Sequence, residues 1–270
     1  MQGWNMRITL GFSPCPNDTF MFYHLLKENL FESDLTIADV ETLNQKALHH
    51  ELDISKVSFY AAWQVMDRYT LLDAGAALGN NCGPLLVTKK NQHTPPLKDA
   101  TVATPGRSTT AHLLFSLYGN NQGKKECMPF NEIMPAVQNG LVDYGVIIHE
   151  GRFTYEKYGL REVADLGTWW EKRYGLPLPL GGIIARKELS SAFIRKFSQA
   201  LHESIVKALS EKEDFNAPLY AYIKGHAQEL DDSVIQQHID LYVNKYSLSL
   251  NGEGRLAVDK FFALLKEYDL

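Results

Sequence analysis

Segments with the residue pattern of β-strands alternate with segments of helical pattern, and this alternation constrains the fold more than any other feature. The β-like segments are residues 7–13, 35–40, 53–58, 84–90, 100–106, 126–130, 141–148 and 179–189. The helical patterns between them cover residues 20–30, 41–51, 59–69, 108–119 and 131–140. Strands that alternate with helices of this length pair in parallel through right-handed crossover connections. The sequence therefore predicts an α/β protein.

The segment KKNQHTPPLKD, residues 89–99, interrupts the alternation. It is polar, contains a double proline and lacks periodicity, which is typical of a linker. From about residue 190 the pattern is wholly helical, with apolar residues spaced near 3.6 positions. We therefore predict two lobes, each with a mostly parallel sheet flanked by helices, a ligand cleft between the lobes, and a helical carboxyl-terminal tail.

Composition excludes several classes of protein. The 270 residues are 45% hydrophobic and 22% charged, and the net charge of −5 gives no reason to expect nucleic acid as a partner. The amino terminus lacks the continuous apolar stretch of a secretory signal, and no segment has the ~18 apolar residues of a membrane span. We therefore expect a cytoplasmic protein without a membrane span.

Three cysteines, Cys15, Cys82 and Cys127, lie far apart without a CxxC pair. Such sparse cysteines fit a reducing compartment and predict neither a disulfide framework nor a zinc knuckle. Cys15 lies between two prolines near the expected cleft. Because no base is near it in the sequence, we expect it to fill space rather than act as a nucleophile.

The junctions between strands and helices are the candidate site, because ligands of open parallel sheets bind beyond the carboxyl ends of the strands. In the first junction, FSPCPNDTF, Asn17 or Asp18 serves either as a helix cap alone or as a fixed wall of the cleft. In the second, Lys56 precedes Ser58. The Ser58 hydroxyl either caps the next helix or holds a polar group of a substrate.

The third junction, TPGRSTT, places Ser108, Thr109 and Thr110 at the first turn of a predicted helix, with Arg107 beside them. Free backbone N–H groups, hydroxyls and the positive end of the helix dipole suit an anionic group. The segment is not the GxxxxGK[ST] motif of a nucleotide phosphate loop. We therefore predict a site for a carboxylate of a small-molecule substrate.

The fourth junction follows the apolar run LVDYGVII with His149, Glu150, Gly151 and Arg152. A partly desolvated histidine at the end of a buried strand suits a general base near neutral pH. Glu150 is placed to orient it, and Arg152 to bind a second carboxylate or pair with Glu150. No HExxH or other close ligand spacing accompanies His149, so no metal is expected. The other histidines, His238 among them, lie at or within helical patterns or in the linker and are interpreted as structural.

Six strings in this order resemble the 1,4-dihydroxy-6-naphthoate synthase family of the futalosine route to menaquinone. They are GFSPCPNDTF at 11–20, DVETLN at 39–44, ALG at 77–79, PGRSTTAHLLFSLY at 105–118, IIHEGRFTY at 147–155 and LPLPLGG at 176–182. They run from residue 11 to residue 182, and six ordered strings make the resemblance more specific than any single motif.

The resemblance implies a two-lobed fold like that of the type II periplasmic binding proteins. The expected larger lobe is discontinuous, residues 1–94 and 185–270, and the smaller lobe covers 95–184. The implied reaction converts cyclic dehypoxanthinyl futalosine to 1,4-dihydroxy-6-naphthoate and dihydroxyacetone without metal or organic cofactor. The resemblance makes His149 the catalytic base. It also implies substrate binding by Lys56, Val57 and Ser58, and by Thr109 and Thr110.

Two other functions remain open from the sequence. A non-catalytic cytoplasmic protein of the same fold that binds a small carboxylate needs the anion site but not His149. The related chorismate dehydratase is a two-lobed enzyme with different chemistry. The IIHE string and the paired threonines favour the naphthoate synthase.

Overall fold

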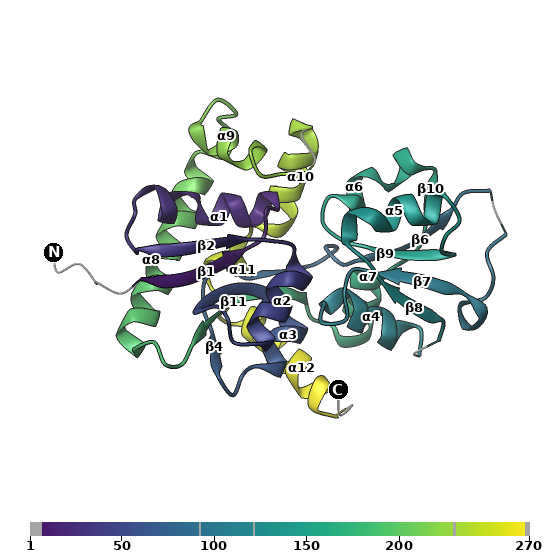
Figure 1. The fold of residues 1–270 in the computed structure, drawn as a ribbon, viewed down its shortest axis with the longest axis horizontal. Coiled ribbons are helices and arrows are strands. Elements are labelled where there is room, and N and C mark those ends of the chain that lie inside the picture. The colour runs from purple at the N-terminus through teal and green to yellow at the C-terminus, as the bar shows by residue number, and fades with distance from the viewer. Residues whose placement is uncertain (1–6, 92, 121, 229–230, 268–270) are drawn as a thin grey trace.

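A computed structural model describes residues 7–91, 93–120, 122–228 and 231–267 of the chain. Its strands are β1 (Ile8–Phe12), β2 (Ser33–Ile37), β3 (Ile54–Ser58), β4 (Tyr69–Leu71), β5 (Ala77–Gly79), β6 (Leu85–Lys89), β7 (Thr101–Thr104), β8 (Lys124–Cys127), β9 (Tyr144–Ile147), β10 (Leu160–Asp165) and β11 (Leu178–Arg186). They form two sheets, and the two lobes built on them lie side by side (Figure 1). The larger sheet has the order β2-β1-β3-β11-β4, with β5 paired to β11, and the smaller has the order β10-β6-β9-β7-β8.

Helices flank both sheets. They are α1 (Pro16–Lys27), α2 (Val40–Leu48), α3 (Phe59–Gln64), α4 (Thr110–Tyr118), α5 (Phe130–Gln138), α6 (Gly151–Thr154), α7 (Leu166–Tyr174), α8 (Ser191–Ser210), α9 (Pro218–Lys224), α10 (Asp232–Tyr242), α11 (Lys245–Leu248) and α12 (Glu253–Glu267). Short 3₁₀ turns, η1 (Leu97–Asp99) and η2 (Tyr155–Tyr158), complete the smaller lobe. The α/β class and the helical tail predicted from the sequence are confirmed.

Both sheets are mixed. β1 pairs in parallel with β2 and β3, and β7 pairs in parallel with β8 and β9, as the βα alternation predicted. β11 is antiparallel to β3, β4 and β5, and β6 is antiparallel to β9 and β10. β6 is the first strand after the chain enters the smaller lobe, and β11 is the first strand after the chain returns to the larger lobe. The prediction of mostly parallel sheets is therefore wrong for the strands beside these two crossings.

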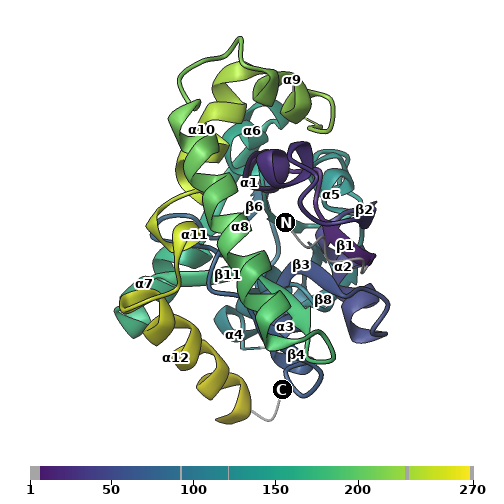
Figure 2. The ribbon, with the colours of Figure 1, turned by 90° about the vertical axis from the view of Figure 1, so that its left-hand side faces the viewer.

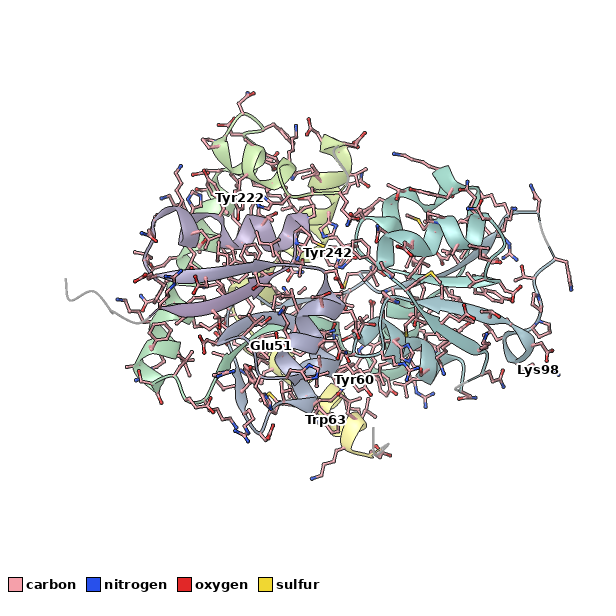
Figure 3. All side chains as sticks on the ribbon, in the orientation of Figure 1. Glu51, Tyr60, Trp63, Lys98, Tyr222 and Tyr242 are labelled. Atoms are coloured by element: carbon pink, nitrogen blue, oxygen red, sulfur yellow. The ribbon has the colours of Figure 1, made fainter. Side chains whose placement is uncertain are left out.

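The chain first crosses between the lobes at residues 80–84, between β5 and β6. The predicted linker, residues 89–99, instead connects two strands of the smaller sheet, and its Lys98 lies at the far edge of the smaller lobe (Figure 3). The expected boundary at residues 94 and 95 thus falls inside the smaller lobe. A polar, proline-rich composition marks a surface loop, and such a loop need not join two lobes.

Apolar side chains of α1 and α8 fill the core beneath the larger sheet, and α8 runs along that lobe in Figure 2. Phe193, Phe197, Leu201 and Ile205 of α8 are fully buried, which confirms the face predicted from their spacing. A second apolar cluster extends across both lobes. In this cluster the ring of Phe261 of α12 lies 5.5 Å from that of Trp170 of α7, measured between ring centroids. The tail therefore also contacts α7, the helix that follows β10 of the smaller sheet.

Candidate active site

A cavity lies between the lobes, beyond the carboxyl ends of β1, β3 and β9. Six of the residues predicted as site residues line it: Lys56, Val57, Ser58, Thr109, Thr110 and His149. Asn17 and Asp18 of the first junction line it as well. Tyr242 of α10 closes the wall and lies between the two lobes in Figure 3. The junctions identified in the sequence therefore converge on one space.

His149 reaches this cavity from the turn that follows β9. Its φ of +55° is in the left-handed region, which few non-glycine residues adopt and which is common at functional sites. The Nε2 atom is buried and has no hydrogen-bond partner among the described residues. Burial lowers the pKa of His149, against the opposing influence of the Glu150 and Asp18 carboxylates. The imidazole is therefore neutral at neutral pH, as a general base must be.

Cys15 contacts the other ring nitrogen of His149, Nδ1. Its Sγ lies 3.4 Å from Nδ1 of His149, although the two residues belong to different lobes. Burial, with Glu150 and Asp18 nearby, raises the pKa of the Cys15 thiol well above its ordinary value. A buried thiol of this kind is a poor nucleophile. Cys15 is thus not merely space-filling, because it contacts His149.

A second buried imidazole, His238 of α10, lines the same cavity. Its Nε2 lies 2.9 Å from Oδ1 of Asn17, and since an amide oxygen only accepts, Nε2 carries the hydrogen. Its Nδ1 then presents a lone pair, and this atom has no partner among the described residues. The His149 and His238 rings are nearly parallel, 6.2 Å apart, and burial together with His149 lowers the pKa of His238 well below its ordinary value.

Asp18 and Lys56 form an ion pair in the cavity wall, with Nζ 2.9 Å from Oδ1. Asp18 also accepts hydrogen bonds from the Ser13 hydroxyl at 2.7 Å and from Nδ2 of Asn17 at 2.9 Å. Lys56 in turn donates to the backbone oxygen of Gly75 at 3.1 Å. Both charges are thus compensated, which a buried ion pair requires. The network fixes Asn17 and, through it, the tautomer of His238.

Ser58 does not cap α3 with its side chain. Instead Nδ2 of Asn44 donates to the Ser58 hydroxyl at 3.1 Å, while the Ser58 backbone N–H donates to Oδ1 of Asn44 at 2.9 Å. The Ser58 hydroxyl oxygen therefore accepts a hydrogen bond from Asn44, and the Ser58 side chain lines the cavity. The sequence left open whether the Ser58 hydroxyl caps α3 or holds a polar group of a substrate, and the structure excludes the cap.

The amino terminus of α4 lines the cavity through Thr109, Thr110 and Ala111. Thr109 caps the helix: its hydroxyl accepts from the backbone N–H of His112 at 3.1 Å and donates to Gly106 at 2.7 Å. The Thr110 hydroxyl donates to the backbone oxygen of Leu180 at 2.9 Å. At the first positions of a helix, the N–H groups of Thr110 and Ala111 have no acceptor within it, so these are the donors suited to an anion.

Ser108 faces the other lobe rather than the cavity. Its backbone N–H donates to the carboxylate of Glu41 at 3.2 Å, and its hydroxyl accepts from Nε2 of Gln45 at 3.0 Å. Asn44 donates to its backbone oxygen. The backbone N–H of Ser108, which was predicted to bind a substrate anion, therefore binds the carboxylate of Glu41 in this arrangement. These bonds from α2 join the two lobes across the mouth of the cavity.

Arg152 does not line the cavity either. Its guanidinium donates to Oδ2 of Asp165 at 2.6 Å and to the backbone oxygen of Gly83 at 2.7 Å. Asp165 also caps α7 by accepting from the N–H groups of Gly167 and Thr168. The expected pairing of Arg152 with Glu150 is therefore wrong, and its guanidinium is engaged at the crossing between the lobes rather than offered to a substrate.

Glu150 does not hydrogen-bond to His149, contrary to the predicted orienting role. Its Oε2 is buried without a partner among the described residues. Its carboxylate nevertheless raises the pKa of both His149 and Cys15 through space. The orientation of His149 rests on Cys15 instead, and Glu150 contributes charge.

His238 and Tyr242 were missed by sequence reasoning. They lie four residues apart on α10 and therefore on one face of the helix, with ring centroids 4.6 Å apart. The available signal was a histidine inside the apolar stripe of Ile235 and Ile239. Such a position is most simply interpreted as a core histidine, because the sequence does not say which helix face reaches the cleft.

Two further properties of the described residues bear on function. Within them, no group of three or more His, Cys, Asp or Glu side chains is placed to hold a metal ion. None of the helices in the same residues has the length and apolar character needed to cross a bilayer.

A family model described as menaquinone biosynthesis matches residues 8–267. The chain belongs to this menaquinone biosynthesis family. Two curated proteins named 1,4-dihydroxy-6-naphthoate synthase are similar to it. The one from Thermus thermophilus is 46% identical, over 95% of this chain and 93% of that protein. The one from Streptomyces coelicolor is 42% identical, over 93% and 90%. These relatives support an enzyme of menaquinone biosynthesis.

Solved structures support the fold. A crystal structure of an Archaeoglobus fulgidus protein is 33% identical, with a TM-score of 0.90 and coverage of 98% of this chain and 99% of that chain. The periplasmic aliphatic sulphonate-binding protein of Escherichia coli is 14% identical, with a TM-score of 0.63 and coverage of 97% and 87%. At that identity the likeness concerns the fold alone. The periplasmic-binding-protein-like fold expected for the family is confirmed.

Proposed function

We propose that this member of the menaquinone biosynthesis family converts cyclic dehypoxanthinyl futalosine to 1,4-dihydroxy-6-naphthoate, with release of dihydroxyacetone. The observation that carries the proposal is the buried Nε2 of His149, which has no partner in the described part of the chain and lies in a cavity that also contains the amino terminus of α4. A general base and an anion site thus face one space. Together they suit the abstraction of a proton from a substrate that carries a carboxylate.

His149 acts as the base through Nε2. With a hydrogen on Nδ1 directed at the sulfur of Cys15, the Nε2 lone pair is free to accept a proton from the substrate. Proton removal starts carbon–carbon cleavage, and formation of the aromatic naphthalene ring drives the reaction forward. The lowered pKa of His149 keeps the base unprotonated at neutral pH.

The substrate carboxylate binds at α4. The backbone N–H groups of Thr110 and Ala111 donate to it, and the helix dipole favours its charge. Ser58 and the Lys56–Asp18 pair form the opposite wall and orient the rest of the molecule. Closure of the lobes excludes water from the reactive intermediate.

His238 supplies a hydrogen-bond acceptor for a hydroxyl group of the substrate. Asn17 holds the hydrogen on Nε2, so Nδ1 has only a lone pair to offer. A substrate hydroxyl that donates to Nδ1 would satisfy this buried atom. We further propose that the protein works in the cytoplasm and needs no organic cofactor or metal for this reaction.

The test follows ultraviolet absorbance with cyclic dehypoxanthinyl futalosine for the wild type, His149→Ala and a control, His93→Ala, in an exposed loop of the smaller lobe. We expect the wild type and the control to form the naphthoate, and His149→Ala to turn over roughly 10²–10⁴-fold more slowly while it still binds substrate. A wild type that binds small carboxylates without converting this substrate would be a binding protein. Consumption of chorismate instead would identify the dehydratase.

A further inference from the structure

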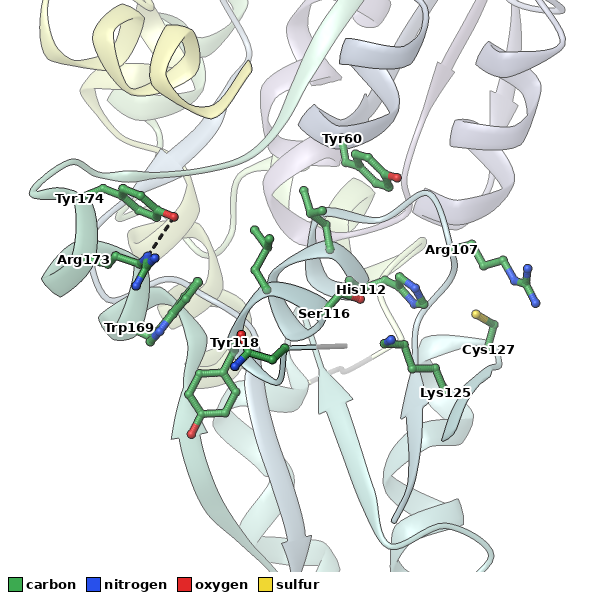
Figure 4. Close-up of a pocket in the computed structure, with 13 residues that line it drawn as sticks. Tyr60, Arg107, His112, Ser116, Tyr118, Lys125, Cys127, Trp169, Arg173 and Tyr174 are labelled. Carbon is green, nitrogen blue, oxygen red and sulfur yellow. Dashed lines mark hydrogen bonds between the residues drawn. The ribbon is translucent and has the colours of Figure 1, made fainter. Parts of the chain in front are cut away.

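A second and larger hollow, of about 910 Å³, lies outside the cavity just described (Figure 4). It follows the face of α4 that carries His112 and Ser116, whereas the cavity meets only the first turn of that helix. Tyr60 of α3 borders it from the larger lobe. The two spaces share no lining residue, and the volume lies within the range typical of small-molecule sites.

One end of this groove is positively charged. Arg107, from the loop before α4, and Lys125, from β8, both border it on the side of α4 that carries His112 (Figure 4). None of the described residues that line the groove is acidic, although the chain as a whole has a net charge of −5. The nearest acid along β8 is Glu126, which points to the other face of the strand and pairs with Lys124 at 2.7 Å.

The other end is aromatic. Trp169 and Tyr174 of α7 border it, with Tyr118 packed edge-on against Trp169 at 6.0 Å between ring centroids. Arg173 lies over both rings of α7, with its guanidinium carbon 5.9 Å from Trp169 and 5.6 Å from Tyr174. Figure 4 shows these side chains on the opposite side of α4 from Arg107 and Lys125. Half-buried indole and phenol rings offer stacking surface to a planar ligand.

We propose that this groove is a second ligand site, which binds a small molecule with an aromatic ring and an anionic group. The anion lies between Arg107 and Lys125, because both are suited to carboxylate or phosphate oxygens. The ring lies against Trp169 and Tyr174. The proposal does not depend on the reaction proposed for the cavity, since no residue of the groove takes part in it.

His112 provides a reporter for the charged end. Its Nδ1 lies 2.9 Å from the Thr104 hydroxyl, and burial together with Lys125 and Arg107 lowers its pKa to about 4. An anion bound between the two cations offsets their repulsion of the imidazolium. The pKa of His112 should then rise by roughly 1 unit, as it does for other groups that gain an opposite charge nearby.

The experiment follows the ring signals of His112 by NMR against pH, with naphthalene-2-sulfonate and AMP as separate probes. Both stay ionised at low pH, and methanesulfonate and inorganic phosphate serve as their ringless controls. We expect each ring-bearing probe that binds to raise the pKa of His112, and its ringless control to do so only at much higher concentration. The order of affinity of the two probes then distinguishes an aromatic acid from a nucleotide.

Variants test the location. In Arg107→Ala/Lys125→Ala the pKa of His112 should be raised without ligand and no longer respond to either probe. Lys124→Ala, on the opposite face of the same strand, should respond like the wild type. Trp169→Leu should reduce the advantage of the ring-bearing probes. If neither probe moves the His112 signals at millimolar concentration, or the ringless controls match them, there is an adventitious anion only and the proposal is wrong.

Discussion

The sulfur of Cys15 lies 3.4 Å from Nδ1 of His149, so the residue that precedes α1 in the larger lobe orients an imidazole carried by the smaller lobe. The proposed base is therefore correctly oriented only when the two lobes are together. Binding and chemistry are coupled by this contact, because a substrate that holds the lobes closed also completes the base.

Cys15→Ser should impair turnover more than Cys15→Ala. A hydroxyl is a stronger hydrogen-bond donor than a thiol and would donate to Nδ1 of His149, which moves the ring hydrogen to Nε2 and removes the lone pair from the cavity. We expect kcat to fall by at least ~10-fold for serine and by less for alanine. Steady-state kinetics on both variants measures this, with Cys127→Ser, on an exposed cysteine, as control. Equal losses for serine and alanine would contradict the proposed tautomer.

His238→Phe should lower kcat/KM by roughly 5- to 150-fold, because a substrate hydroxyl that loses its buried acceptor costs about 1–3 kcal/mol. Asn17→Asp tests the same contact by pH. A carboxylate in place of the amide raises the pKa of His238, so the acid limb of the pH profile of kcat/KM should move to higher pH. The profile of His226→Gln, on another histidine of the helical tail, should stay unchanged. A His238→Phe enzyme with wild-type kinetics would exclude this residue from substrate binding.

Glu41→Gln should stabilise the protein near pH 7. Burial raises the pKa of Glu41 above its ordinary value of 4.5. Its contribution to stability is therefore fully present below about pH 4.5 and is lost as the pH rises through the raised value. The neutral amide keeps an acceptor for the Ser108 N–H, so we expect a gain below ~1 kcal/mol, since the side chain is partly exposed.

Urea denaturation of the wild type and Glu41→Gln at several pH values between about 4 and 7 measures this difference, which should vanish at the acid end. Glu51→Gln is the matched control, because Glu51 is exposed and pairs with Lys46 at 2.7 Å. A gain for Glu41→Gln that does not vary with pH would show that the charge of Glu41 is not its cause.

Gly106→Ala should destabilise the closed arrangement of the lobes. Gly106 has a φ of +139°, and a Cβ there would lie 2.4 Å from the carboxyl carbon of Glu41. Backbone strain alone costs about 1–3 kcal/mol. Gly140→Ala is the control, because Gly140 has a φ of +72° but no atom within 4 Å of an added Cβ. Thermal unfolding should place Gly106→Ala below Gly140→Ala, and Glu41→Ala should restore part of the difference.

Arg152→Ala should reduce stability while leaving KM nearly unchanged. Removal of the guanidinium leaves Asp165 without its ion-pair partner, and because both side chains are partly exposed the cost should lie below the ~3 kcal/mol of a fully buried pair. Denaturation and steady-state kinetics together measure the two effects, with the exposed Arg161→Ala as control. A large rise in KM at unchanged stability would instead restore the substrate-binding role expected from the sequence.

The sequence predicts the parts of the site that lie at strand ends. His149 directly follows a β-like segment, Ser58 ends one, and Thr110 begins the helix after another; parallel strands bring their carboxyl ends to one edge of a sheet. Local pattern therefore suffices for them. His238 comes from α10, far along the chain, and its proximity to the cavity depends on how the tail packs against α1, which no local pattern encodes.

The short strands escape prediction for a similar reason. β4 and β5 have three residues each, and both owe their extended conformation to pairing with β11, about a hundred residues later. The sequence did not identify the crossing between the lobes, because residues 80–84, NNCGP, are as turn-rich as the proline-containing segment 89–99. At this crossing a Cβ on Gly83 would lie 2.2 Å from the backbone nitrogen of Gly167, a requirement visible only in three dimensions.

The position of β11 in the larger sheet determines the order in which the molecule can be completed during synthesis. β11 lies between β3 and β4 and also pairs with β5, yet it follows every strand of the smaller sheet along the chain. A nascent chain therefore contains all strands of the smaller lobe while the edge of β3 still awaits its partner. An unpaired strand edge is a template for association with other chains. Chains released before residue 178 should therefore aggregate. They contain every strand of the smaller sheet, but the larger sheet lacks β11.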